Sequence, residues 1–79
     1  MKLQIFSPEK TIYDGNVDSV LVPGRNRRPF MILDSYTPLI STLEDGIIRY
    51  VADDKEHEIQ ISSGFIEVRK DVVSICVEL

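Results

Sequence analysis

The chain has 79 residues, enough for one domain with a small core, because a chain of this size buries only about 60% of its unfolded surface. Thirteen acidic and nine basic residues give a net charge of −4, which argues against a general nucleic-acid-binding protein. The single cysteine, Cys76, excludes an internal disulfide and suits a reducing compartment.

The N-terminal residues show no targeting signal, since the side chains after Met1 alternate between polar and apolar. No apolar run approaches the roughly 20 residues that cross a bilayer. We therefore expect a soluble chain, which could still bind to a membrane protein.

Residue types and their spacing predict an all-β fold. Isoleucine and valine are abundant and Ala52 is the only alanine, and β-branched side chains pack better on pleated strands than in helices. Nowhere do apolar residues recur at helical spacing over about ten positions. The segments that read as strands span residues 2–6, 11–13, 17–22, 30–33, 39–43, 47–51, 58–61, 65–68 and 72–77. Turn residues between them recur at the spacing typical of a sandwich or barrel.

The first part of the chain reads as three short strands. Leu3 and Ile5 alternate with polar residues, so both should point into the core. The dipeptide Asp14-Gly15 favours a hairpin turn directly after the second strand. Asp18 falls in the phase of the apolar residues of the third strand, which suggests a bulge or an edge position there.

The second half of the chain reads as hairpins. Residues 47–51 should pair with residues 58–61 across a polar tip at 53–56, with Arg49 and Glu58 on solvent-facing sides. The last strand places three apolar residues on one face: Val73, Ile75 and Val77.

The longest departure from this strand–turn rhythm runs over residues 23–39. It opens with a Pro-Gly turn signal, carries Arg25, Arg27 and Arg28, continues into a short apolar strand and closes on Pro38. The prolines indicate an ordered excursion, which in a small protein is usually where a partner binds. The arginine cluster itself is open to three interpretations: a solvated loop, a contact with a protein partner, or a contact with a polyanion. The net negative charge of the chain disfavours the last.

The sequence offers little catalytic chemistry. His57 is the only histidine and is interpreted as a solvated turn residue near a hairpin tip. Cys76 has no histidine or cationic neighbour in the sequence to activate its thiol, so it is interpreted as structural. These two residues lack a further soft ligand for a metal, and the acidic residues at 53–58 lack the glycine and spacing of a calcium loop. We predict no catalytic, metal-binding or cofactor-binding residues and no cofactor.

Several short motifs form an ordered pattern over nearly the whole chain. They are residues 7–10 with 13–15, residues 17–20 with 23–24, residues 37–40, Gly46 with Ile47 and Arg49, residues 63–68, and residues 72–77. Together these motifs resemble the N-terminal part of the epsilon subunit of the F-type ATP synthase.

This resemblance implies a ten-stranded β-sandwich or flattened barrel of short antiparallel strands over residues 1–79. In the family a two-helix C-terminal domain follows; the chain printed here ends where the sandwich ends, so we expect no helical domain and carry over no inhibitory or ATP-sensing role. The implied function is non-catalytic. The sandwich joins the central rotor, clamps the gamma subunit to the c-ring and couples proton flow to ATP synthesis. It would lie peripherally at the cytoplasmic face of the bacterial inner membrane, with only indirect membrane association through the c-ring and no nucleic acid bound.

The resemblance also assigns residues to the two partners. The loop that matches the c-ring-facing tip contains Arg25, Asn26, Arg27 and Arg28. The positions that match the contact with gamma are Ser7, Asp34, Ser35, Tyr36, Thr37, Pro38 and Leu39. This chain departs from the family where arginines replace an acid-rich tip, where Met31 replaces a glycine and where Tyr36 replaces a histidine. Because the charge of the tip is inverted, we expect an acidic or carbonyl-rich loop of the ring as its partner.

Two other functions stay open at this point. One is a stand-alone β-sandwich adaptor that binds a soluble protein through residues 23–39, and the other is a small nucleic-acid-binding barrel that contacts phosphates through the arginines. A rotor subunit should expose an apolar patch on one face of the sandwich, around Tyr36, Leu39 or Ile40.

Overall fold

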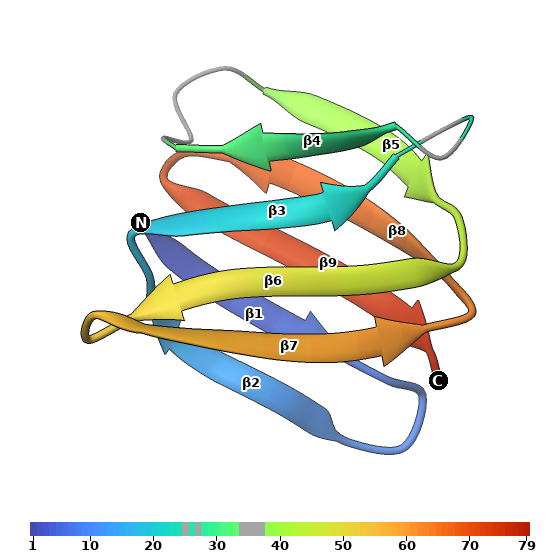
Figure 1. Ribbon diagram of the computed structural model, residues 1–79, viewed down its shortest axis with the longest axis horizontal. Coiled ribbons are helices and arrows are strands. Elements are labelled where there is room, and N and C mark those ends of the chain that lie inside the picture. The colour runs from blue at the N-terminus through green and yellow to red at the C-terminus, as the bar shows by residue number, and fades with distance from the viewer. Residues whose placement is uncertain (25, 27, 34–37) are drawn as a thin grey trace.

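The computed structural model describes residues 1–24, 26, 28–33 and 38–79, and this part of the chain forms nine strands (Figure 1). The strands are β1 (Lys2–Phe6), β2 (Thr11–Asn16), β3 (Ser19–Pro23), β4 (Pro29–Ile32), β5 (Leu39–Leu43), β6 (Gly46–Ala52), β7 (Lys55–Ile61), β8 (Ser63–Arg69) and β9 (Val72–Glu78). The prediction of an all-β sandwich is confirmed. The family resemblance implied ten strands, and the described residues form nine.

The strands form two sheets that pack face to face (Figure 1). One sheet has the order β2-β1-β9-β8-β5, and the other has the order β4-β3-β6-β7. Paired strands are antiparallel, as expected, except β1 and β9, which run parallel in the middle of the five-stranded sheet.

The side chains between the sheets form one apolar core. Leu3 and Ile5 are fully buried, as their alternation predicted, and the three apolar residues of β9 share the inner face. The buried apolar residues are Leu3, Ile5, Val17, Val20, Val22, Ile32, Leu43, Ile48, Tyr50, Ala52, Ile61, Ile66, Val68, Val73, Ile75 and Val77. Each large aliphatic side chain in this set stabilises the fold by about 1.5–3 kcal/mol relative to an exposed one.

The irregular phase at Asp18 marks a change of sheet. The Val17 amide donates to the carbonyl of Met1 (2.9 Å), in the five-stranded sheet, and the Asp18 amide donates to the carbonyl of Val51 (2.8 Å), in the four-stranded sheet. The irregularity is therefore a crossover between the sheets and neither of the predicted alternatives, a bulge or an edge position, because β3 begins at Ser19 and lies between β4 and β6.

The hairpin predicted at Asp14-Gly15 is wrong, because β2 continues through both residues to Asn16. Gly15 lies opposite Leu3 in the ladder with β1. A Cβ atom on Gly15 would lie 2.7 Å from the hydroxyl of Tyr13, so the glycine makes room for that ring inside a strand. Pairing with β1 overrides the local turn preference.

Two hairpins close with two-residue turns in the left-handed backbone region. Asp53 and Asp54 have φ values of 53° and 62° between β6 and β7, and Lys70 and Asp71 have φ values of 47° and 66° between β8 and β9. Two consecutive positive φ values define the tight turn that matches the twist of antiparallel strands. The predicted pairing of β6 with β7 is confirmed, but its turn is shorter than the predicted four-residue tip.

Connections alternate between the two ends of the sandwich (Figure 1). The β1–β2, β3–β4, β5–β6 and β7–β8 connections lie at one end, which we call the tip end because it holds the arginine-rich loop. The β2–β3, β4–β5, β6–β7 and β8–β9 connections lie at the opposite end. The partner-facing segments that the sequence suggested are thereby divided between the two ends.

Candidate docking surfaces

The base of the arginine-rich tip is a closely packed hairpin. Pro23 and Pro29 lie opposite each other in the β3–β4 ladder, and neither has an N–H to extend it. Inside this pair the Gly24 amide donates to the carbonyl of Arg28 (3.2 Å). A Cβ atom on Gly24 would lie 2.5 Å from that carbonyl oxygen, so only glycine fits here.

The described part of the tip presents its side chains to solvent. Asn26 and Arg28 are both exposed, and Asn26 has a φ of 57°, a conformation that asparagine tolerates better than most residues. Arg25 and Arg27, the other predicted c-ring-facing residues, lie outside the described residues. Arg28 therefore provides the charge that the described tip offers to a partner.

The turn between β5 and β6 supports this hairpin from the side. A Cβ atom on Gly46 would lie 2.8 Å from the Cβ of Pro23, which shows how closely the two segments pack. A shallow groove of about 370 Å³ runs from here over the outer face of the four-stranded sheet. Its lining residues are Leu21, Pro23, Pro29, Asp45, Gly46, Ile47 and Arg49.

The predicted gamma-facing residues lie at opposite ends of the five-stranded sheet. Ser7 follows β1 at the tip end, where its amide donates to the carbonyl of Lys10 (2.9 Å) and its hydroxyl lies 3.3 Å from the same carbonyl. Pro38 is exposed and Leu39 half-buried at the start of β5, at the other end. The remaining predicted positions, Asp34, Ser35, Tyr36 and Thr37, lie outside the described residues.

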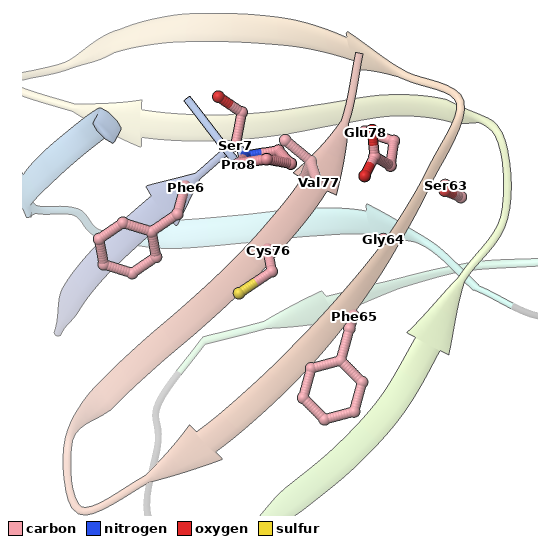
Figure 2. A pocket seen from close by; sticks show the side chains of 9 residues that line it. All are labelled: Phe6, Ser7, Pro8, Ser63, Gly64, Phe65, Cys76, Val77 and Glu78. Atoms are coloured by element: carbon pink, nitrogen blue, oxygen red, sulfur yellow. The ribbon is translucent and has the colours of Figure 1, made fainter. Parts of the chain in front are cut away.

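An apolar band on the outer face of the five-stranded sheet connects these two ends. Phe6, Cys76 and Phe65 lie in one register row across β1, β9 and β8. Figure 2 shows the Cys76 thiol between the two phenyl rings. Ile40 on β5 is the diagonal neighbour of Phe65, because Thr42 is the residue directly opposite. Ile40 is 66% exposed and Phe65 44% exposed, so the band is open to solvent.

Two hollows lie along this band. The first, of about 340 Å³, is at the tip end and is lined by Phe6, Ser7, Pro8, Ser63, Gly64, Phe65, Cys76, Val77 and Glu78 (Figure 2). The second, of about 540 Å³, is at the opposite end and is lined by Pro38, Leu39, Ile40, Glu67, Val68, Arg69 and Lys70. Ser7 lines the first hollow, and Pro38 and Leu39, the other described residues of the predicted gamma-facing set, line the second.

The described part of the sandwich also has a gap between its edge strands β4 and β5. Met31 is 54% exposed and Leu33 67% exposed beside this gap. A hollow of about 320 Å³ enters it, lined by Phe30, Met31, Ile32, Leu33, Pro38, Leu39 and Val68. Because Leu39 lines both this gap and the second hollow, the apolar surface continues from the outer face around the β5 edge.

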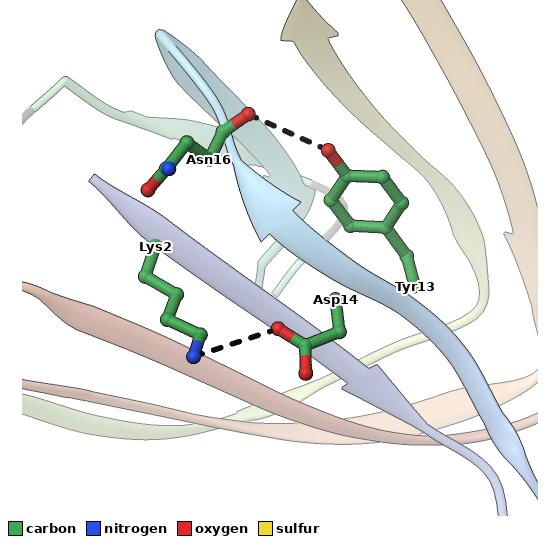
Figure 3. Close-up of polar contacts among 4 residues, drawn as sticks. All are labelled: Lys2, Tyr13, Asp14 and Asn16. Atoms are coloured by element: carbon green, nitrogen blue, oxygen red, sulfur yellow. Dashed lines mark hydrogen bonds and ion pairs between the residues drawn. The ribbon is translucent and has the colours of Figure 1, made fainter.

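The opposite edges, β2 and β7, are joined by aromatic rings. The ring of Tyr50 lies 4.5 Å from that of Tyr13 and 5.0 Å from that of His57, centroid to centroid, the second pair being stacked. Burial, and secondarily the neighbouring Tyr13, raise the pKa of Tyr50 above its ordinary value. Polar contacts tie the same edge together, since the Tyr13 hydroxyl donates to the carbonyl of Asn16 (3.4 Å) (Figure 3).

His57 corrects the sequence interpretation. It lies within the ladder of β7, opposite Tyr50, and not at the hairpin tip. The reason is the short turn at Asp53 and Asp54, which starts β7 at Lys55. His57 is therefore an exposed but stacked ring that belongs to the closed edge.

Within residues 1–24, 26, 28–33 and 38–79, no group of three His, Cys, Asp or Glu side chains could hold a metal ion. The same residues contain no helix long and apolar enough to cross a bilayer.

Sequence reasoning found part of the apolar surface and missed the rest. Ile40 was expected in an exposed patch, and it is exposed. Phe6 and Phe65 were missed, although each falls in the polar phase of a strand whose other phase is buried. A large aromatic residue in the outer phase is the signal that could have identified this face.

The chain matches a known protein family over its whole length. The model for the "ATP synthase, Delta/Epsilon chain, beta-sandwich domain" matches residues 1–79. An ATP synthase epsilon chain of Leptospira borgpetersenii is 40% identical over 75 residues, 95% of this chain and 58% of the relative. That of Carboxydothermus hydrogenoformans is 36% identical over 75 residues, 95% of this chain and 55% of the relative. This chain thus spans less than two thirds of the length of these relatives.

Solved structures show the same fold. A chain in the central stalk and c-ring structure of the Tetrahymena thermophila mitochondrial ATP synthase matches with a TM-score of 0.81 at 15% identity, covering 100% of this chain and 63% of that one. A chain in the Euglena gracilis mitochondrial ATP synthase matches with a TM-score of 0.84 at 22% identity, covering 95% of this chain and 48% of that one.

Proposed function

This chain belongs to the ATP synthase delta/epsilon-chain family through its β-sandwich domain, and from that premise we propose that it is a non-catalytic part of the central stalk of an F-type ATP synthase. In this role it clamps the gamma subunit to the c-ring, so that rotation of the ring driven by proton flow turns the shaft and supports ATP synthesis elsewhere in the complex. Its place is peripheral, at the cytoplasmic face of a bacterial inner membrane, held there by the ring.

The observation that carries this proposal is the apolar band on the five-stranded sheet. Large exposed apolar side chains that form a contiguous surface mark an interaction site in a soluble protein. The band joins Ser7 to Leu39, two sequence-distant positions that the family resemblance assigns to the same partner. We therefore assign this face, with the adjoining β4–β5 gap, to the gamma subunit.

The tip serves the second contact, with the c-ring. Arg28 is exposed on a hairpin whose base is fixed by Gly24 and by the paired prolines. A rigid base lowers the entropic cost of binding, because little has to be ordered on contact. The cation selects a loop that offers carboxylate or carbonyl oxygens.

The mechanism is mechanical. A close-packed interior has low compressibility and transmits strain, so two surfaces on one small sandwich move together. The tip and the apolar band lie on the same rigid body, and torque applied at one is delivered at the other. No bond is made or broken in this chain.

The native Cys76 tests the assignment directly, because it is exposed and lies in the centre of the band. We expect the purified gamma subunit to bind the chain and to slow alkylation of Cys76 by a maleimide on the order of tenfold or more, since the reagent must wait for dissociation. The measurement is the rate of thiol modification by mass spectrometry with and without gamma.

A matched control carries Cys76→Ser with Gln60→Cys, which moves the thiol to the exposed outer face of the four-stranded sheet. This variant should bind gamma and stay reactive. If gamma captures the chain while Cys76 keeps its full reactivity, the face is wrongly assigned. If gamma does not bind the folded chain at all, the stalk function fails and a stand-alone adaptor becomes the better hypothesis.

A further inference from the structure

The apolar band ends in groups of opposite charge. At the tip end, Glu9 and Glu78 line one small hollow together with Ser7 and Pro8. Glu78 also lines the hollow that contains Cys76, so these carboxylates border the band. Two carboxylates that line one hollow give this end of the band a negative charge that attracts a cation.

The hollow at the opposite end of the band has a net positive lining. Arg69 and Lys70 line the second hollow, beside Leu39 and Ile40. Glu67 lines it too, so the two cations exceed the one carboxylate there. Both cations are exposed, and Lys70 stands on a tight turn that holds its backbone in place.

These end groups differ from the four charged residues that form the two ion pairs of the described sandwich. Lys2, at the start of β1, pairs with Asp14 on the edge strand β2 at 3.7 Å (Figure 3), and Arg49 pairs with Glu58 at 2.8 Å on the other sheet. Among the described residues, Glu9, Glu78, Arg69 and Lys70 make no ion pair. Charges left without a partner at both ends of an apolar surface are suited to steer a partner onto it.

We propose that the band accepts its partner in one orientation only, set by these two ends. The partner surface has an apolar centre over Phe65 and Cys76, basic side chains over Glu9 and Glu78, and acidic side chains over Arg69 and Lys70. This inference rests on the proposed function, in which the gamma subunit covers this face. The inference specifies which side chains the gamma surface presents and in which orientation gamma lies on the band.

Opposite charges at the two ends exclude the reversed placement. Turning the partner by half a turn would bring acid over Glu9 and Glu78 and base over Arg69 and Lys70, and like charges facing each other across an interface strongly oppose binding. The apolar centre gives no such directional preference, because apolar burial is non-directional. Specificity of this kind depends on the repulsive alternative as much as on the attractive pair.

Charge reversal at each end tests the proposal, with the purified gamma subunit as the probe. Arg69→Glu with Lys70→Glu should weaken binding by about tenfold or more at low salt, and Glu9→Lys with Glu78→Lys should do the same. Exchanging all four charges reverses both ends at once, so a partner turned by half a turn again meets complementary charges, and the quadruple variant should bind more tightly than either double variant. The Kd of each variant is measured by titration calorimetry at two salt concentrations, after circular dichroism has shown that the fold is kept.

Glu56→Lys is the matched control, because this exposed residue lies on β7, away from the band. Its Kd for gamma should lie within about twofold of the wild-type value, and the salt dependence of binding should match that of the wild type. If the wild-type chain binds gamma and both end reversals leave the Kd within the range of this control, the orientation rule is wrong and the stalk function stands. If the wild-type chain does not bind gamma, the proposed function itself fails.

Discussion

The two lateral edges of this sandwich, where the two sheets meet side by side, differ in how they are packed. Between β2 and β7, Tyr13, Tyr50 and His57 fill the gap with three rings in contact. Between β4 and β5 the gap has no such filling among the described residues, and Met31 and Leu33 stand more than half exposed beside a hollow of about 320 Å³.

This difference separates the part of the molecule that stabilises it from the part that binds. Each aromatic pair stabilises the fold by about 0.5–1.5 kcal/mol beyond the contribution of its buried area. The apolar side chains of the β2–β7 side are therefore covered by contacts within the chain. Apolar side chains exposed to water at β4–β5 contribute little to the stability of the fold, and they would be buried only when a partner binds. A small domain with a modest core has reason to keep such a surface only where it is used.

Removal of the central ring at the closed side should have the largest effect. Tyr50→Ala deletes a side chain that is only 7% exposed, so we expect the free energy of unfolding to fall by about 3 kcal/mol or more, from lost burial and the cavity that remains. Urea denaturation followed by circular dichroism measures it. Affinity for gamma, corrected for the folded fraction, should be unchanged. A loss below about 1 kcal/mol would show that the rings do not close this side.

Most of the fold could be predicted from local alternation. Strands such as β1 and β9 have one fully buried phase, so the pattern of apolar residues alone places Leu3, Ile5 and Ile75 in the core. The failures came where tertiary pairing overrides local preference. Asp14-Gly15 has strong turn chemistry, yet β1 holds it in a strand, and Asp18 breaks the alternation because the chain changes sheets there.

The docking surface was harder to predict because it depends on register. Phe6 and Phe65 are 59 positions apart in number, and only the shared contact with Cys76 through β9 places them in one row. No property of either short segment contains that information. The aromatic contact of His57 was missed for the same reason, since it required the exact length of the turn before β7.

A substitution at the open side should separate binding from stability. Leu33→Ser removes a side chain that is 67% exposed, so the free energy of unfolding should change by no more than about 0.5 kcal/mol. If gamma covers the gap, affinity should fall by about tenfold, as for a buried interface residue. Ile47→Ser is the control, because this residue lies on the outer face of the four-stranded sheet and should not affect gamma binding. Equal affinities for both variants would remove the gap from the interface.

The smallest expected effect is a loss of stability at alkaline pH that comes from Tyr50 at the β2–β7 side. Burial, and then Tyr13, raise the pKa of Tyr50 in the folded chain above its unfolded value of about 10.0. The folded state therefore holds the phenolic proton more tightly, so the stabilisation is complete below pH 10 and is lost as the pH rises through the folded pKa. Tyr50→Phe has no proton to lose, so between pH 9 and pH 11 its unfolding midpoint should fall less than that of the wild type. The two proteins share every other ionisable group, so the difference between their profiles reports on the Tyr50 hydroxyl. Parallel pH profiles would mean that the Tyr50 hydroxyl stays in water, and that the rings cover this side less completely than their spacing indicates.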